Sequence, residues 1–188
     1  RVKTLLWARY GDEQAALQRF SANDGLSSMG RGIVLARQNR ISEATAAFDQ
    51  ALKTAPEDPL VLREAGAFHY RKGDMGRADG LLSKAMRIDP KDYMASFFYA
   101  RMLDETGRQA QAASYYKDVL RYVREDAEVH ETYARSLGKA GNTPDAYIHM
   151  AYSALYSNHQ KLAERHFNEA KSMSARGTDT RAFQRLAA

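Results

Sequence analysis

A repeat with a period of 34 residues constrains what this 188-residue chain can fold into. Several kinds of residue recur at that spacing between residues 32 and 153. A fixed period of this length indicates stacked copies of one small helical unit, each burying its apolar face against its neighbours. The recurring sets are Ala44, Ala78, Ala112 and Ala146; Phe48, Leu82, Tyr116 and Met150; Gly32, Gly66, Ala100 and Ala134; Asn39, Gly73, Gly107 and Gly141; and Ala51, Ala85, Val119 and Ser153.

Each of these columns has a structural task. The glycine column, with Asn39 as its first member, falls where one helix ends and the chain must turn through a left-handed conformation. The small residues let two antiparallel helices approach closely, and the large apolar residues fill the space between neighbouring pairs. Pro56 and Pro90 end the second helix of the first two units, because proline cannot continue a helix. Arg124 replaces the third proline.

This pattern resembles the tetratricopeptide repeat (TPR), a helix pair with a period of 34 residues. The resemblance runs from Gly25 to about Asn158. It implies an all-α fold, a right-handed α-α superhelix of antiparallel helix pairs that forms a TPR solenoid. We expect the solenoid to occupy residues 25–177, with units near 25–58, 59–92, 93–126 and 127–157 and an extra helix at 160–173.

The two ends depart from the regular repeat. Residues 1–24 read as a degenerate helix pair with helices near 2–9 and 13–20, because Gly11, Ala16 and Phe20 match three of the columns. Trp7 is expected to pack against this pair, the alternative being an exposed anchor for a further domain. At the other end Ala163 lies half a period after Ala146, which predicts the extra helix. A short capping helix is expected at 178–188.

Composition excludes several classes of protein. The 28 basic and 23 acidic residues leave a net charge of +5, and the two signs alternate along most of the predicted helices, so nucleic acid is not an expected partner. There is no cysteine, which excludes disulfides and thiol chemistry. No apolar run is long enough to cross a membrane. Cytoplasm and periplasm both remain compatible with the composition.

No catalytic residue, metal site or cofactor is predicted in this chain. The zinc motif HExxH, the nucleophile motif GxSxG and a phosphate-binding glycine loop are all missing from the sequence. His159 and His166 are seven residues apart without a third ligand, which is too little for a metal site. His69 and His130 lie on predicted first helices and are expected to be partly buried and hydrogen-bonded.

The remaining feature is the concave surface that stacked first helices line. Arg37 and Arg71 occupy equivalent positions on successive first helices, and so do Arg101 and Arg135. We therefore predict a basic groove with aromatic residues beside it, suited to an extended acidic segment or a carboxylate, which arginine binds through two parallel hydrogen bonds. The groove set is Arg37, Arg63, Tyr70, Arg71, Phe97, Arg101, Glu131, Arg135, Lys139 and Tyr152.

An equally open alternative is that these arginines are solvated or paired with Glu131, Asp104 and Glu105. TPR domains that bind the C-terminal carboxylate of chaperones use an asparagine on the first helix. The matching positions here are Ile33, Ala67, Arg101 and Arg135. This departure argues against binding of chaperone tails.

The order of parts resembles the C-terminal TPR tail of the BepA-like periplasmic zinc metalloproteases, relatives of the CAAX prenyl proteases. The similar segments are residues 1–3, 15–20 and 30–35, the half-period shift at 146–156, and the final helix with its arginine-bearing tail. This resemblance implies a periplasmic or envelope location and an upstream catalytic domain that holds zinc, with the TPR region engaging substrate or envelope-assembly partners. The start at Arg1 rather than Met fits such a fragment. The alternative is a stand-alone TPR adaptor in pilus or envelope assembly.

Overall fold

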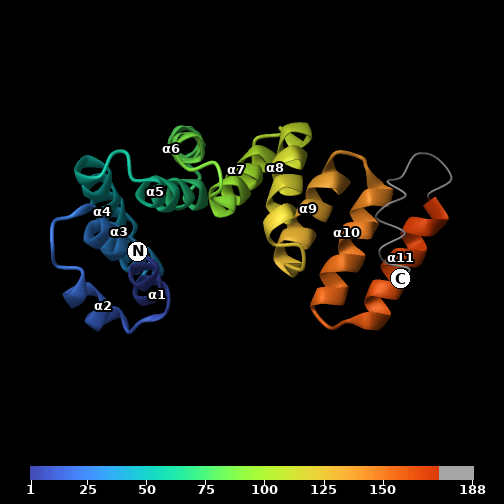
Figure 1. The fold of residues 1–188 in the computed structure, drawn as a ribbon, viewed down its shortest axis with the longest axis horizontal. Helices are drawn as coiled ribbons and strands as arrows, with labels where there is room; N and C mark the ends of the chain where they lie inside the picture. Colours follow the sequence, from blue (N-terminus) through green and yellow to red (C-terminus); the bar gives the residue numbers. More distant parts are fainter. Residues whose placement is uncertain (174–188) are drawn as a thin grey trace. The chain divides into compact units, whose positions relative to one another are not determined.

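The computed structural model describes residues 1–173, and this part of the chain is all-helical with no strand, as the repeat predicts. The predicted capping helix at 178–188 lies outside the described residues. Figure 1 shows the helices in chain order. They are α1 (Val2–Tyr10), α2 (Glu13–Arg19), α3 (Gly25–Arg37), α4 (Ile41–Thr54), α5 (Pro59–Arg71), α6 (Met75–Ile88), α7 (Tyr93–Glu105), α8 (Gln109–Tyr122), α9 (Ala127–Lys139), α10 (Thr143–Tyr156) and α11 (Gln160–Met173).

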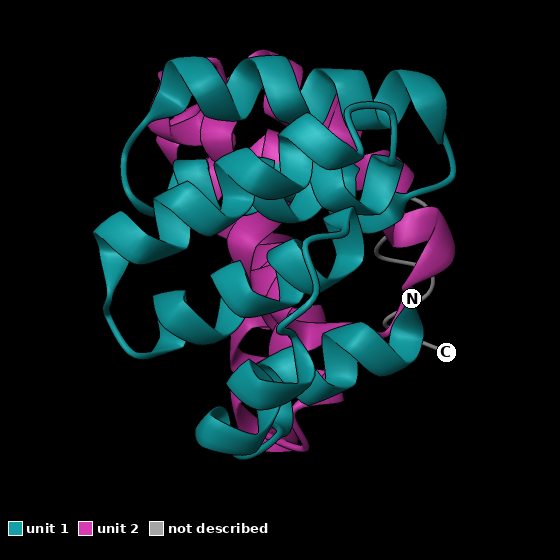
Figure 2. Cartoon of the chain, turned by 90° about the vertical axis from the view of Figure 1, so that its left-hand side faces the viewer, with its two compact units in different colours: residues 1–98 teal, residues 99–188 magenta. Residues whose placement is uncertain are grey.

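Two compact units divide the chain within α7, at residues 98 and 99 (Figure 2). In unit 1, α3 pairs with α4 and α5 pairs with α6, while α1 lies against α3. In unit 2, α10 packs extensively against both α9 and α11. Helix α10 is therefore the second helix of one pair and also the first helix of another, as the half-period shift predicts.

The turns between paired helices use left-handed residues. The predicted turn column is confirmed, because Asn39, Gly73, Gly107 and Gly141 have φ values of 58°, 83°, 77° and 81°. Asn158, between α10 and α11, has a φ of 60° and continues the same pattern. At Gly73 nothing lies within 4 Å of the place a Cβ would occupy, so the backbone angle and not lack of space favours glycine there.

The small-residue column serves close packing, as predicted. A Cβ added at Gly66 would lie 2.7 Å from Cγ of Leu82, and one added at Gly32 would lie 2.9 Å from the ring of Phe48. The equivalent Ala100 is fully buried. At these positions the backbone of the first helix lies directly against the large apolar side chain of the second helix.

The large apolar column holds at three of its four positions. Phe48, Leu82 and Tyr116 are at most 1% exposed, and Phe48 stacks on Phe68 of the following first helix at 4.8 Å. Met150 is 36% exposed, so the prediction that it fills the interior is wrong. The reason is the half-period shift, because no further first helix in the described residues covers Met150 as α5 covers Phe48.

Aspartate starts each regular first helix. Asp24, Asp58, Asp92 and Asp126 lie 34 residues apart and accept hydrogen bonds from backbone amides in the first turns of α3, α5, α7 and α9. Such caps satisfy amides that have no partner inside the helix and favour the charge at the helix start. This column supports the repeat but was not among the predicted ones.

The N-terminal pair adopts the predicted arrangement. Trp7 packs against a cluster that includes Ala16 and Phe20, and the guanidinium of Arg19 lies 5.3 Å from the centre of its ring. Trp7 is partly buried, which agrees with the packing expectation. The pair places α1 beside the first helices of unit 1, where the candidate site forms.

Candidate functional site

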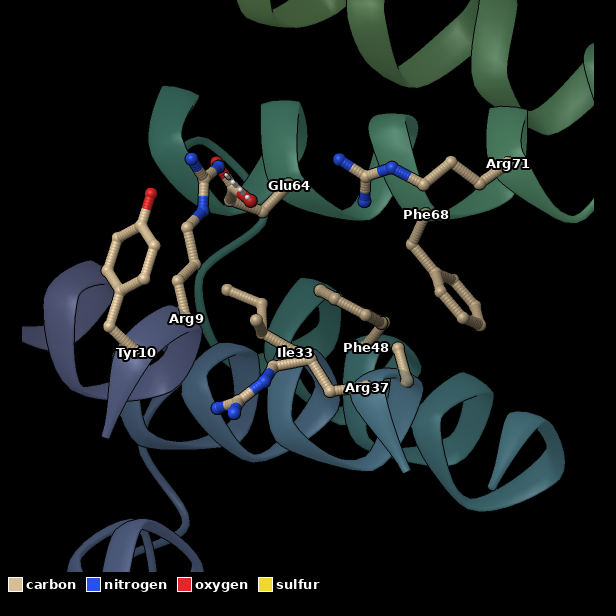
Figure 3. A pocket seen from close by; sticks show the side chains of 9 residues that line it. Arg9, Tyr10, Ile33, Arg37, Phe48, Glu64, Phe68 and Arg71 are labelled. Atoms are coloured by element: carbon tan, nitrogen blue, oxygen red, sulfur yellow. Dashed lines mark hydrogen bonds and ion pairs between the residues drawn. The ribbon is translucent and has the colours of Figure 1, made fainter. Parts of the chain in front are cut away.

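Unit 1 contains a pocket of about 450 Å³ between α1, α3 and α5 (Figure 3). Its size falls within the range of ordinary ligand pockets. Helices α1, α3 and α5 supply all but one of the lining side chains, and α4 supplies the other. The lining residues are Arg9, Tyr10, Ile33, Ala36, Arg37, Phe48, Glu64, Phe68 and Arg71.

The base of the pocket is apolar. Phe48 and Phe68 are 1% and 4% exposed, and their rings stack with an interplanar angle of 27°. Ile33 and Ala36 complete this base from α3. Because these side chains belong to the core of unit 1, the base is fixed by the same packing that holds the repeats together.

One wall of the pocket is a buried ion-pair network. Arg9 of α1 donates to both carboxylate oxygens of Glu64 at 2.8 and 3.0 Å, and the side chain of Glu64 is only 2% exposed. Arg63 donates to the same Glu64 at 2.8 Å and to Asp92, the cap of α7, at 2.9 Å. Burial alone would lower the pKa of Arg63, but the carboxylates of Glu64 and Asp92 outweigh it and raise that pKa.

Two further arginines line the pocket, from successive first helices. Arg37 donates from Nη1 to the carbonyl oxygens of Ala8 and Gly11 at 3.0 and 3.2 Å, and its Nη2 lies 3.6 Å from Glu13. Hydrogen bonds to carbonyls orient the guanidinium but leave its charge in place. Arg71 extends along α5 toward Glu64 in Figure 3, and its guanidinium lies 5.1 Å from the ring centre of Phe98.

The structure distributes the predicted groove residues of unit 1 unevenly. Arg37 and Arg71 line one pocket. Arg63 is 11% exposed and lies in the ion-pair network instead of displaying its charge. Tyr70 and Phe97 are 6% and 4% exposed, which places them in the packed interior.

The two predicted groove arginines of unit 2 are paired with acidic side chains. Arg101 lies 3.4 Å from Glu128, and the exposed Arg135 lies 3.0 Å from Glu131, one turn away on α9. Lys139 is exposed. Tyr152 stacks on His130 at 5.0 Å within an aromatic cluster.

Seven of the nine lining residues lie outside the predicted groove set, and Arg9, Tyr10 and Glu64 are the polar ones among them. Arg9 and Tyr10 lie on the degenerate N-terminal helix, which carries no repeat column to mark its inner face. Glu64 lies on α5 in a predicted first helix, and the one available signal was an acidic residue that follows Arg63 in a largely apolar helix segment.

The lining of the pocket combines charged and aromatic side chains. Its lining side chains include three guanidinium groups and one carboxylate above an aromatic base, but no serine, threonine, cysteine or histidine. Within residues 1–173 no three metal-ligating side chains come together. No helix in that same range is long and apolar enough to cross a membrane.

Comparison with protein-family models gives a match to the family described as tetratricopeptide repeat. The matched segments are residues 14–59, 29–93 and 69–128, which together cover more than half of the chain.

Curated relatives match over about half of this chain. The UDP-N-acetylglucosamine–peptide N-acetylglucosaminyltransferase SPINDLY of Hordeum vulgare is 29% identical over 106 residues, and an interferon-induced protein with tetratricopeptide repeats 2 of Cricetulus griseus is 27% identical over 103. These matches cover 56% and 50% of this chain but only 11% and 22% of the relatives, which are much longer proteins.

Solved structures share the fold at low sequence identity. A structure of MamA (AMB-1) has a TM-score of 0.71 with 22% identity and covers 84% of this chain and 97% of its own. YrrB, described as a TPR protein with an unusual peptide-binding site, has a TM-score of 0.68 with 17% identity, covering 86% of this chain and 87% of its own. These likenesses confirm the predicted TPR solenoid.

Proposed function

The chain belongs to the tetratricopeptide repeat family, whose fold serves as a protein-binding scaffold, and from that premise we propose that it binds an extended acidic segment of a partner protein through the pocket of unit 1. The observation that carries this proposal is the meeting of Arg37 and Arg71, from successive first helices, in one pocket. Arginine suits a carboxylate through its planar pair of donors. The peptide-binding site named in the description of YrrB is a precedent within the fold.

Unit 1 is the better place for this role than unit 2. In unit 2, Arg101 and Arg135 of the predicted column lie beside Glu128 and Glu131. In unit 1, Arg9 pairs with Glu64, and Arg37 lies 3.6 Å from Glu13 while it donates to the carbonyl oxygens of Ala8 and Gly11. Three guanidinium groups and one carboxylate line the pocket, so its lining has a formal net positive charge.

A random dodecapeptide library selected on the immobilised chain tests this proposal. We expect enrichment of peptides rich in Asp and Glu. Their affinity should fall at least about tenfold in the double variant Arg37→Ala with Arg71→Ala, because charge-assisted hydrogen bonds are lost. Arg87→Ala, an exposed arginine on α6 of the same unit, is the matched control and should bind as the wild type does.

Arg37 also holds α1, so the single variant Arg71→Ala separates ligand binding from folding. Its circular dichroism should match that of the wild type while its affinity for acidic peptides falls. Undiminished affinity in both arginine variants, or selection of peptides without acidic residues, would overturn the proposal.

A finer proposal concerns the protein in which this chain works. We infer a TPR region that assists a periplasmic zinc metalloprotease, on the order of parts noted above. The outer face of α1 supports it, because Val2 and Leu6 lie one turn apart and are 72% and 55% exposed, an apolar surface that a catalytic domain could cover. Zinc content and an HExxH sequence in the native full-length protein would support this assignment. A full-length protein with neither would favour the stand-alone adaptor in pilus or envelope assembly.

A further inference from the structure

Helix α1 contributes little to the core of unit 1. Only Ala8 of its nine residues is buried, whereas α5 buries ten of its thirteen. Leu5 and Trp7 are partly buried and pack against neighbouring helices. A helix of nine residues is not stable alone in water, so α1 is folded only while it is docked. Its docking therefore depends on a small number of contacts.

Arginines at the two ends of α1 join it to carboxylates on α5. Arg9 donates to both carboxylate oxygens of Glu64 at 2.8 and 3.0 Å, and Arg1 pairs with Asp58 at the start of α5. Figure 3 shows the side chain of Arg9 reaching from α1 to Glu64. Arg37 of α3 adds a third polar contact, because it donates to two backbone carbonyl oxygens at the end of α1.

Both carboxylates on α5 have partners besides α1. Glu64, whose side chain is 2% exposed, also accepts hydrogen bonds from Arg63 at 2.8 and 3.1 Å. Asp58 also accepts hydrogen bonds from the amides of Leu60 and Val61, as the cap of α5. Breaking a buried ion pair is costly where it leaves a charge without a partner. Release of α1 leaves neither carboxylate in that condition, which keeps the cost of undocking low.

The next helix, α2, is anchored to α3 by contacts of its own. A Cβ added at Gly30 of α3 would lie 2.9 Å from the ring of Phe20, so this ring packs directly on the backbone of α3. Arg31 of α3 donates to the carbonyl oxygen of Phe20 at 3.1 Å. Only Gly11 and Asp12 connect α1 to α2. Helix α1 can therefore leave α3 and α5 while α2 remains in place.

We propose that α1 is a strap, which undocks from α3 and α5 as one unit and is kept closed by the ion pair between Arg9 and Glu64. Elements with few buried contacts open locally at a lower free energy than the rest of a protein. Arg9 and Tyr10 line the pocket of unit 1, so the pocket loses one wall whenever the strap opens. A ligand that needs this wall binds only the closed form, and its apparent affinity falls with the closed fraction.

Hydrogen exchange of the full chain, read by mass spectrometry, tests the strap without any ligand. In the wild type, amides of α1 should exchange at least about tenfold faster than those of α3 and α5. In Arg9→Gln the exchange of α1 should rise by roughly a further tenfold, because two charge-assisted hydrogen bonds are lost, while α2, α3 and α5 keep their protection. Lys3→Gln removes a charge from an exposed position of the same helix and should exchange as the wild type does.

The fluorescence of Trp7, the single tryptophan, reports on the same opening. Trp7 packs against a cluster that includes Ala16 and Phe20 while α1 is docked, and undocking exposes its ring to water. Arg9→Gln should therefore shift its emission to longer wavelength and increase its quenching by acrylamide, relative to the wild type and to Lys3→Gln.

Three results would overturn the strap. Equal protection of α1, α3 and α5 in the wild type would show that α1 opens only when the whole unit unfolds. Equal exchange and quenching in Arg9→Gln and Lys3→Gln would show that the ion pair does not hold α1 closed. Protection lost from α1 and α2 together in Arg9→Gln would show that α1 is not the unit that moves. The proposed function has a separate test, because that test measures peptide binding and depends on Arg71 of α5.

Discussion

Asp104 is a carboxylate in the interior of unit 2, and it joins three helices. Its two oxygens accept hydrogen bonds from the hydroxyl of Tyr116 on α8 at 2.7 Å and from the hydroxyl of Ser136 on α9 at 2.5 Å. Buried hydroxyls without a partner cost about 1–3 kcal/mol each. Asp104→Ala should therefore lower the free energy of unfolding by roughly 3 kcal/mol, as measured by urea denaturation. Ser136→Ala removes only one of the two bonds and should cost less; equal stability of Asp104→Ala and the wild type would contradict this role.

A second residue-scale feature of unit 2 is a pair of buried histidines. His130 donates from Nε2 to the carbonyl oxygen of Arg124 at 2.9 Å, so in the neutral ring its Nδ1 accepts the hydrogen bond from Nδ1 of His149 at 2.8 Å. Burial, followed by the charges of His130 and Lys117, lowers the pKa of His149 to about 3. Burial also lowers the pKa of His130, against the opposing carbonyl of Arg124 and the carboxylate of Asp126.

These shifts predict that the chain loses stability in mild acid. The unfolded chain protonates histidine below about pH 6.5, whereas the folded chain keeps His149 neutral down to about pH 3. The stabilisation is therefore complete above pH 6.5 and falls as pH drops through this window, by up to ~1.4 kcal/mol per pH unit for each histidine. Urea denaturation at pH 7.5 and 5.5 should show that the free energy of unfolding falls less between these pH values in His149→Gln than in the wild type. His159→Gln, which changes an exposed histidine outside the cluster, should leave the loss unchanged, and a pH-independent wild type would refute the argument.

At the scale of the helix, the aspartate column sets where each first helix begins. Asp126 accepts a hydrogen bond from the amide of Val129 at 3.0 Å in an exposed position. Loss of such a cap costs about 1 kcal/mol, so Asp126→Ala should lower the melting temperature while Asp126→Asn largely preserves it. Glu125→Ala is the neighbouring control, since Glu125 is equally exposed and caps nothing in the described structure. Equal effects of the two alanine variants would show that charge and not capping matters.

The helices were predictable from the sequence because their boundaries depend on local chemistry. Gly73 and Asn39 mark turns by the backbone angle they permit, and Gly66 marks close packing by its missing side chain. Only two of the nine residues that line the pocket, Arg37 and Arg71, were predicted from the sequence as site residues. Arg37 and Arg71 share a repeat column, whereas the pairing of Arg9 with Glu64 joins positions 55 residues apart on helices that follow no common pattern. The exposure of Met150 escaped prediction for a similar reason, since it depends on which helix comes next.

For the whole molecule, stability arises from contacts between near neighbours in the chain. The extensively packed helix pairs in the described residues are adjacent or next-adjacent in order, such as α3 with α4 and α3 with α5. In repeat proteins of this kind, stability is approximately a sum of the stabilities of the repeats and of their interfaces. A local disturbance should then remain local, in contrast to a globular core that loses its order throughout.

Two glycine substitutions in unit 1 test this locality. One should lower the free energy of unfolding and the other should raise it. In Gly66→Ala the new methyl group would lie 2.7 Å from Cγ of the fully buried Leu82, and overpacking of about 1–3 kcal/mol should outweigh the helical advantage of alanine. Gly80 lies on the exposed face of α6, and nothing lies within 4 Å of the place a Cβ would occupy there. Gly80→Ala should therefore raise the free energy of unfolding by up to ~1 kcal/mol, because alanine favours the helix more than glycine does. Hydrogen exchange read by mass spectrometry should show lost protection in Gly66→Ala centred on α5 and α6, with α10 and α11 unchanged. Protection lost equally in α10 and α11 would show that the chain unfolds as one cooperative body and that its repeats are not independent neighbours.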